Sequence, residues 1–125
     1  MRNLIFTPFK MKVLIVHKQE AVLQNIKSQM TNWYVKTLSS GLDGLIACKL
    51  EVFDLILCGQ SLPVVTGIEL VRSIRNMSLN KHTPVVLLAE GNETEEHERI
   101  LNILHANLMT MEEVTDLGNF KLNIN

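Results

Sequence analysis

The sequence predicts a doubly wound α/β fold, in which a five-stranded parallel sheet carries helices on both faces. Three runs of consecutive apolar residues, rich in Val, Ile and Leu, are typical of strands that are buried on both faces. Segments with apolar residues at helical spacing lie between the runs. Because strands that alternate with helices join through right-handed crossovers, we expect the sheet to be parallel.

The first half of the chain supplies two strands and two helices. Val13–Val16 is an apolar run that stops at polar residues, and Ala21 to about Met30 has the apolar spacing of a helix. Residues 34–38 form a shorter strand candidate. A second helix is predicted from the glycines at 41 and 44 into the apolar residues 45–50.

The second half repeats the alternation. The strongest strand, Asp54–Cys58, ends at Gly59, and a loop through Pro63 and Gly67 leads into the next helical pattern. Pro84 opens the fourth strand, which continues to Ala89, because a proline costs least at a strand's first residue.

The last third is expected to hold a helix, a short strand and a final helix. Asn92 and Glu95 have the spacing of a capping box, which places the start of the fourth helix. The fifth strand is predicted near Asn107 to Met111. The final helix would carry Val114, Leu117 and Phe120.

Length and composition predict one domain. The chain has 125 residues, of which 46% are hydrophobic and 20% charged, as in ordinary globular proteins. We expect residues 1–11 to be an N-terminal extension and 12–125 a single domain; the natural start, Met1 or Met11, stays open. No secretory signal or membrane-spanning stretch is evident, so the expected location is the cytoplasm.

Charge and cysteine content exclude several functions. The net charge is -1 and basic residues are scattered singly, so direct nucleic-acid binding is not expected. Cys48 and Cys58 lie in apolar surroundings and are expected to be buried free thiols. No Cys/His spacing suggests zinc and no Gly-rich phosphate loop follows the first strand, so we expect no cofactor and no enzyme activity.

Four segments resemble response-regulator receiver domains, and the similarity covers about Lys12 to Leu117. The most specific piece is the loop Leu62-Pro63-x-x-x-Gly67 before Glu69. The resemblance implies a flavodoxin-like sheet in strand order 2-1-3-4-5 and a role in two-component phosphorelay signalling. The segments are 12–20, 54–70, 83–89 and 108–112.

The residues that the resemblance would place in the phosphorylation site are replaced here. His17 and Lys18 stand where receivers have an acidic pair that helps hold magnesium, and Gly59 stands where an aspartate accepts the phosphoryl group. Further replacements concern the switch residues: Ala89 takes the place of a Ser or Thr, Leu108 of an aromatic residue, Met111 of a lysine and Glu112 of a proline.

These replacements predict a pseudo-receiver. Phosphoryl transfer to a carboxylate needs a nucleophilic oxygen and a hard cation, and Gly59 supplies no nucleophile. Lys18 would repel a cation, and Met111 cannot pair with a phosphoryl oxygen. We therefore expect a phosphorylation-independent protein–protein interaction module whose partner is a signalling protein.

Two features have both a plain and a functional interpretation. His17 and Lys18 are a solvated strand end or an anion pocket. The acidic residues around the fourth helix are favourable charge at a helix N-terminus or a partner-docking patch; they are Glu90, Glu93, Glu95, Glu96 and Glu98. A homodimer through the fourth helix, fifth strand and last helix is a further hypothesis.

Two other functions stay open. An unorthodox phosphoryl acceptor would use His17, with Glu90 or Glu112 recruited for a metal ion. A small-ligand binder of flavodoxin type is the other, although the loop after the first strand lacks a Ser/Thr/Gly run.

Overall fold

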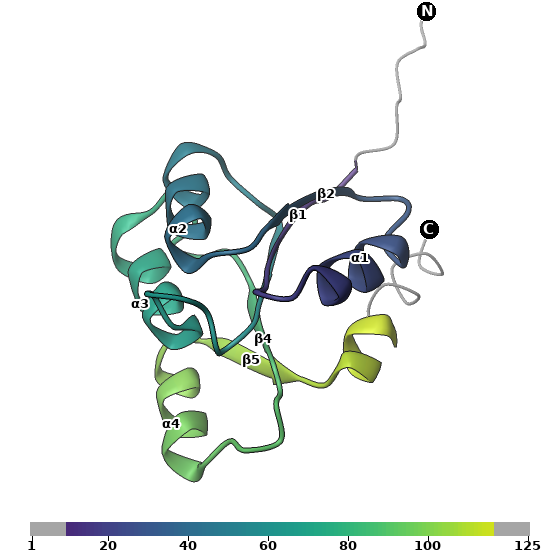
Figure 1. The fold of residues 1–125 in the computed structure, drawn as a ribbon. Coiled ribbons are helices and arrows are strands. Elements are labelled where there is room, and N and C mark those ends of the chain that lie inside the picture. Colours follow the sequence, from purple (N-terminus) through teal and green to yellow (C-terminus); the bar gives the residue numbers. More distant parts are fainter. Residues whose placement is uncertain (1–9, 117–125) are drawn as a thin grey trace, which may run out of the picture.

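The computed structural model describes residues 10–116 and confirms the predicted fold class. Five parallel strands form one sheet in the order β2-β1-β3-β4-β5 (Figure 1). The elements are β1 (Lys12–Val16), α1 (Glu20–Ser28), β2 (Tyr34–Leu38), α2 (Gly41–Leu50), β3 (Leu55–Cys58), α3 (Gly67–Met77), β4 (Val85–Leu88), α4 (Glu95–Ile103) and β5 (Ala106–Met109). Residues 111–116 begin another helix. The predicted roles of Leu117 and Phe120, and most of the expected extension 1–11, lie outside the described residues.

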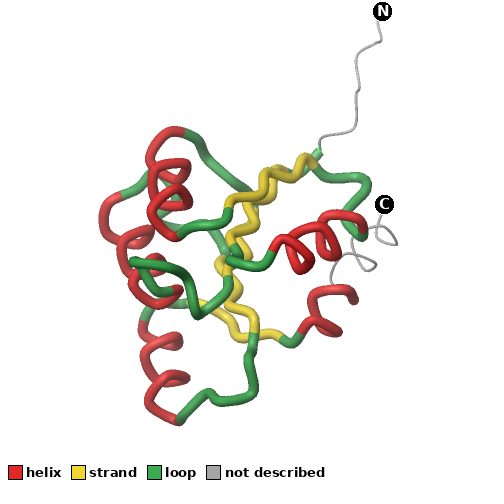
Figure 2. The backbone as a smooth tube through the Cα atoms, in the orientation of Figure 1, coloured by secondary structure: helices red, strands yellow, loops and turns green. Residues whose placement is uncertain are grey.

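Helices cover both faces of the sheet. Figure 2 shows α2, α3 and α4 on one side of the strands, and α1 and the helix from 111 on the other. The sheet separates two hydrophobic cores, and alternate residues of each strand pack into one core or the other. Leu14 and Ile56 pack toward α2 and α3. Ile15 and Leu57 pack toward α1. All four side chains are fully buried. The continuous apolar runs of the sequence therefore arise from strands that face a core on each side.

The predicted start of the fourth helix was wrong by two residues. Thr94, rather than Asn92, is the N-cap, and its side chain accepts a hydrogen bond from the His97 backbone N–H. The Glu93 carboxylate instead accepts hydrogen bonds from the backbone N–H groups of Glu90 and Gly91. These bonds hold the chain in a turn after β4, so the helix begins only beyond Glu93.

The fifth strand also ends earlier than predicted, at Met109 rather than near Met111. Thr110 caps the following helix: its backbone N–H donates to Glu113 and its hydroxyl accepts from the Glu113 backbone N–H. Met111 therefore belongs to the first helical turn and packs partly against the core on the α1 side. The expected strand-end position of Met111 was wrong because this cap starts the helix immediately.

The amino edge of the sheet is closed by a buried amide. Asn80 is fully buried; its Oδ1 accepts from the Phe53 backbone N–H at 2.7 Å and from the Thr83 hydroxyl at 3.0 Å. Its Nδ2 donates to the carbonyl oxygens of Cys48 and Glu51. Every polar group of this side chain is thus paired, which fixes the ends of α2, α3 and β3 relative to one another.

Candidate functional site at the carboxyl edge of the sheet

Three of the residues singled out in the sequence meet at the carboxyl edge of the sheet. His17 directly follows β1, Gly59 follows β3 and Ala89 follows β4. Backbone hydrogen bonds extend the sheet to each: Gly59 N–H donates to the Val16 carbonyl at 2.8 Å, and Ala89 N–H to that of Met109 at 2.8 Å. This is the edge at which open parallel sheets place their ligand crevice.

The His17 ring lies against Gly59. A Cβ atom placed on Gly59 would be 2.7 Å from His17 Cδ2 and 3.2 Å from Nε2. His17 Nδ1 accepts a hydrogen bond of 3.0 Å from the Gln19 backbone N–H. The imidazole therefore occupies the space that a side chain at position 59 would need, and the loop after β1 holds the ring there.

Burial favours the neutral form of His17. Removal of the ring from water lowers the pKa of His17, Lys18 lowers it further, and the negative charge of Glu90 partly opposes both. Since Nδ1 accepts from Gln19, the proton of the neutral ring is assigned to Nε2. An anion pocket that depends on protonated His17 is disfavoured by these contacts, and exposed Lys18 is then its remaining cation.

The loop between β3 and α3 is packed closely on the same edge. A Cβ on Gly67 would overlap the Gly59 carbonyl oxygen, so only glycine permits this approach. Gly67 N–H donates to the Gln60 carbonyl at 2.9 Å, and Thr66 with Glu69 forms a capping box at the start of α3. Val64, at the loop tip, has φ 67° and is 92% exposed.

A polar cradle beside Gly59 was missed by the sequence analysis. The Gln60 side chain donates to the Leu88 carbonyl and to the Glu93 carboxylate, and the Ser61 hydroxyl donates to Glu90. An open cavity of about 230 Å³ lies next to it. Its lining residues are Gln60, Ser61, Thr66, Ile68, Glu90, Asn92 and His97. These residues come from two segments far apart in sequence, each a loop and the first turn of the helix that follows it, so no local pattern indicated them.

The acidic residues around α4 divide into two groups. Glu93 points back to the turn, where hydrogen bonds from backbone N–H groups and Gln60 lower the pKa of its carboxyl group. Glu95, Glu96 and Glu98 lie in the first turn of α4 and are exposed. Of the predicted docking patch, Glu95, Glu96 and Glu98 are therefore free to contact a partner, whereas the Glu93 carboxylate is bound to the turn after β4.

The remaining switch position, Leu108, lies on β5 and packs partly against the core on the α2 and α3 side. Neither Leu108 nor Ala89 carries a hydroxyl or an aromatic ring; Leu108 is level with Leu87 of β4, and the backbone N–H of Ala89 donates to the carbonyl of Met109.

The sequence comparison decides the family. Residues 13–110 match the model of the response regulator receiver domain. The chain belongs to this family. Among curated relatives, the cell cycle transcriptional regulator CtrA of Caulobacter vibrioides is 30% identical over 87 residues, and response regulator ArlR of Staphylococcus aureus is 28% identical over 85. The matches cover 68% and 66% of this chain but 37% of each relative, so the receiver spans well under half of their length.

Solved receivers share the fold. The chemotaxis protein CheY4 of Vibrio cholerae superimposes with a TM-score of 0.77 at 24% identity, covering 90% of this chain and 98% of that one. The receiver domain of the histidine kinase CKI1 of Arabidopsis thaliana, solved with Mg²⁺, gives 0.75 at 17% identity, covering 92% of each chain. At these identities the likeness establishes the fold alone.

The residues at the carboxyl edge of this receiver do not fit a magnesium ion. Mg²⁺ prefers several oxygen ligands, whereas the positions after β1 and β3 hold an imidazole, an ammonium group and a glycine: His17, Lys18 and Gly59. Within residues 10–116, no three His, Cys, Asp or Glu side chains are grouped as metal ligands would be. Among the described residues, Glu90 is the carboxylate whose charge raises the pKa of His17.

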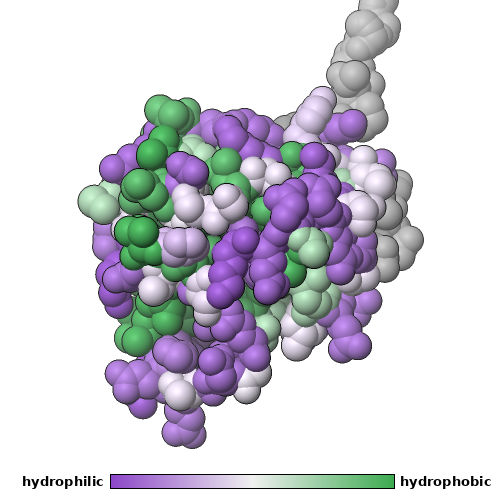
Figure 3. Space-filling model, in the orientation of Figure 1, coloured by the Kyte–Doolittle hydropathy of each residue, from purple (hydrophilic) through white to green (hydrophobic). Residues whose placement is uncertain are grey.

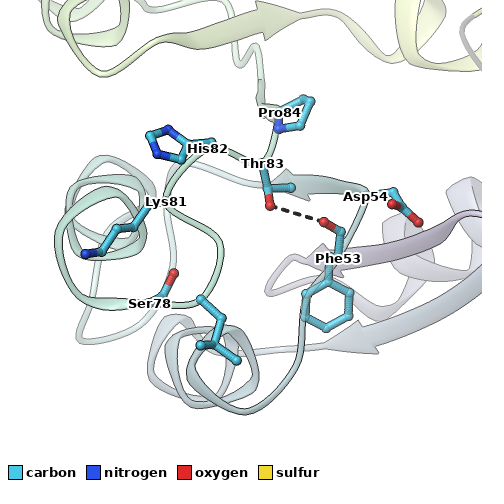
Figure 4. A pocket seen from close by; sticks show the side chains of 8 residues that line it. Phe53, Asp54, Ser78, Lys81, His82, Thr83 and Pro84 are labelled. Atoms are coloured by element: carbon cyan, nitrogen blue, oxygen red, sulfur yellow. Dashed lines mark hydrogen bonds between the residues drawn. The ribbon is translucent and has the colours of Figure 1, made fainter.

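A second cavity of this receiver, about 430 Å³, lies at the opposite edge of the sheet (Figure 4). Part of its wall belongs to the Asn80 network: the Thr83 hydroxyl lies 3.1 Å from the Phe53 carbonyl oxygen and 3.0 Å from Asn80 Oδ1, and its one proton is shared between these two acceptors. Lys81 and His82 border it from the loop before Pro84. Within the described residues, no helix is long and apolar enough to cross a bilayer.

Proposed function

We propose that this receiver is a phosphorylation-independent binding domain that engages a signalling protein. The observation that carries the proposal is the packing of the His17 ring over Gly59, which places an imidazole where a receiver's acceptor side chain would lie. A mere loss of the acceptor would leave an empty position. In this chain the His17 ring fills the space that the acceptor side chain would occupy, so this edge of the sheet is packed rather than open.

The chemistry of the edge supports the same proposal. Phosphoryl transfer to this position would require an oxygen nucleophile, and the backbone at Gly59 offers none. Lys18 repels the divalent cation that would neutralise the developing charge. Ala89 has no hydroxyl to follow a phosphoryl group, so the domain lacks the first step of the usual receiver switch.

The partner surface proposed for this function is the exposed acidic first turn of α4. Glu95, Glu96 and Glu98 favour a partner with basic side chains, although charge at a helix N-terminus also stabilises the helix itself. We further propose that the partner is a signalling protein and that the receiver binds it in the cytoplasm.

Amide NMR titration of the whole chain tests the proposal. Mg²⁺ and then beryllofluoride should leave the signals of Lys18, Gly59 and Ala89 unchanged, and an acyl phosphate should add no mass to the protein. A saturable shift localised at these strand ends, or a stable increase in mass, overturns phosphorylation independence.

A rebuilt variant is the matched positive control. His17→Asp, Lys18→Asp and Gly59→Asp together restore three carboxylates and remove the ring that blocks position 59. We expect this variant to bind Mg²⁺ where the parent chain does not, because the scaffold is otherwise that of a receiver.

The same experiments separate the two other functions. Acid-labile phosphate on the parent chain, lost in His17→Gln, would support His17 as an unorthodox acceptor. The present geometry opposes it, because Nδ1 is already occupied by the Gln19 N–H. A coloured purified protein would favour a flavodoxin-type ligand.

A further inference from the structure

Helix α2 is apolar on the side that faces away from the protein. Its buried side consists of small residues, Gly41, Gly44, Ala47 and Cys48. Its large residues Leu42, Ile46 and Leu50 are 52%, 47% and 76% exposed. Residues spaced by four lie on one face of a helix, so the three form a continuous stripe. A helix whose buried side and opposite side are both apolar is normally covered on both of these sides.

The stripe is the centre of a larger apolar surface. Nine large apolar side chains are exposed within the described residues, and seven of them are on α2, at its two ends or at the end of α3. Figure 3 shows hydrophobic residues gathered over α2 and α3. Leu79 joins α2 through a hydrogen bond to the Cys48 carbonyl, and Gly41 touches Val65, the neighbour of Val64. We call these seven residues the α2 surface: Leu42, Ile46, Leu50, Val52, Val64, Met77 and Leu79.

We propose that the α2 surface binds a second copy of this chain, with the two α2 helices packed antiparallel across a two-fold axis near Ile46. This inference goes beyond the proposed function and does not depend on phosphorylation. The homodimer predicted through α4, β5 and the last helix is a separate hypothesis; on the described part of that face, Ile103 is the single exposed large apolar residue.

The order of residues along α2 is what favours a second copy over another partner. Leu42 and Leu50 are equally far from Ile46, and so are the charged residues Asp43 and Lys49. In an antiparallel pair, Leu42 of each copy lies level with Leu50 of the other, and Asp43 level with Lys49. The apolar stripe is therefore symmetric about Ile46 and can pack against its own copy, as a two-fold interface requires, with Asp43 and Lys49 in the polar rim on its opposite flanks.

The α2 surface is also large enough to form the centre of a dimer interface. It is formed by seven large apolar side chains, each between 47% and 92% exposed, whereas monomeric proteins rarely expose a contiguous apolar patch of more than a few hundred Å². A standard interface buries about 800 Å² on each partner, and a polar rim supplies the rest. Asp43, Lys49 and Lys81 are available for that rim, and a groove bordered by Lys49, Met77 and Leu79 lies beside the helix.

Sedimentation and light scattering from micromolar to millimolar chain concentration are the first test. We expect a reversible dimer, and Ile46→Glu should weaken it by about tenfold or more, because it buries a charge at the two-fold axis. Ile103→Glu, an equivalent change on α4, should leave the dimer intact. Thermal unfolding of Ile46→Glu and Ile103→Glu separates loss of association from loss of fold. A strictly monomeric parent chain, or a dimer lost in Ile103→Glu and kept in Ile46→Glu, overturns the proposal.

Cross-linking gives a readout independent of affinity. Ile46→Cys should form an intermolecular disulfide under air oxidation, because positions 46 of the two copies meet at the axis. Leu50→Cys should not pair with itself, since its two positions would lie about 12 Å apart along the helices. The native thiols do not interfere: burial raises the pKa of Cys48 and Cys58 to about 12. Cross-linking of Leu50→Cys with none from Ile46→Cys would contradict the antiparallel pair.

Discussion

The imidazole of His17 and the backbone of Gly59 are matched in space, with the ring 2.7 Å from the position of a Cβ on residue 59. The two residues follow β1 and β3, which are distant in sequence. The absence of a side chain at Gly59 makes room for the ring of His17. Neither residue alone explains the edge of this receiver; their contact does.

We predict that Gly59→Ala destabilises the protein by about 1–2 kcal/mol, because the new methyl group overlaps the His17 ring. In a His17→Ala background the same change should cost markedly less, since the ring is gone. Chemical denaturation of the four chains in this double-mutant cycle measures the coupling. Equal costs in both backgrounds would show that the ring does not restrict position 59.

Stability should fall as the pH drops below neutral because of His17. Burial lowers the pKa of His17 in the folded protein, so the unfolded chain binds a proton first as the solution is acidified. The favourable contribution is complete above the unfolded pKa, near 6.5, and is lost as pH falls toward and through the folded pKa.

The measurement is the difference in unfolding free energy between the parent chain and His17→Gln from about pH 7 to pH 5. The parent should lose more stability than the variant over this interval. The pKa values of Glu51, Glu69 and Glu93 are also lowered in the folded protein. Because both chains contain these residues, their contribution to the pH dependence cancels in the difference. Parallel curves, or an NMR titration of His17 above its usual pKa, would contradict the prediction.

Val64→Gly should stabilise the protein by about 1 kcal/mol. Val64 is β-branched and sits at φ 67°, a conformation that strains such a residue and that glycine adopts freely. Its side chain is 92% exposed, so little packing is lost in the monomer. Thermal unfolding at low concentration checks it. Val52→Gly, an exposed valine without positive φ, is the control and should lower stability; a loss at both positions would argue against strain at Val64.

Asn80→Ala should cost about 3 kcal/mol or more, because it leaves the Phe53 N–H and the Glu51 carbonyl without their partner and removes one of the two hydrogen bonds to the Cys48 carbonyl. Asn76→Ala, on the exposed side of α3, should change stability by about 0.5 kcal/mol or less. Denaturant unfolding of both variants tests the pair. Similar small effects would mean that water replaces the amide at position 80.

Local patterns predicted most of the fold because strands and helices each have a characteristic spacing of apolar residues along the sequence. The apolar runs at 13–16 and 55–58 and the helical spacing of α1 and α3 lie where they were expected. The two errors, at the start of α4 and the end of β5, occurred where side chains bond to backbone groups. Thr94 and Thr110 both cap helices, and several polar residues near each compete for that role.

The sequence by itself determined the class of fold, the family resemblance and the identity of the residues at the strand ends: His17, Gly59 and Ala89. Only the tertiary structure decided that the His17 ring fills the space over Gly59, and that α2 turns Leu42, Ile46 and Leu50 outward. Strand patterns depend on neighbours along the chain, which the sequence displays directly. Contacts between strand ends, and the choice of which side of an apolar helix is buried, depend on packing between segments far apart, as Gly44 of α2 against Val16 of β1 illustrates.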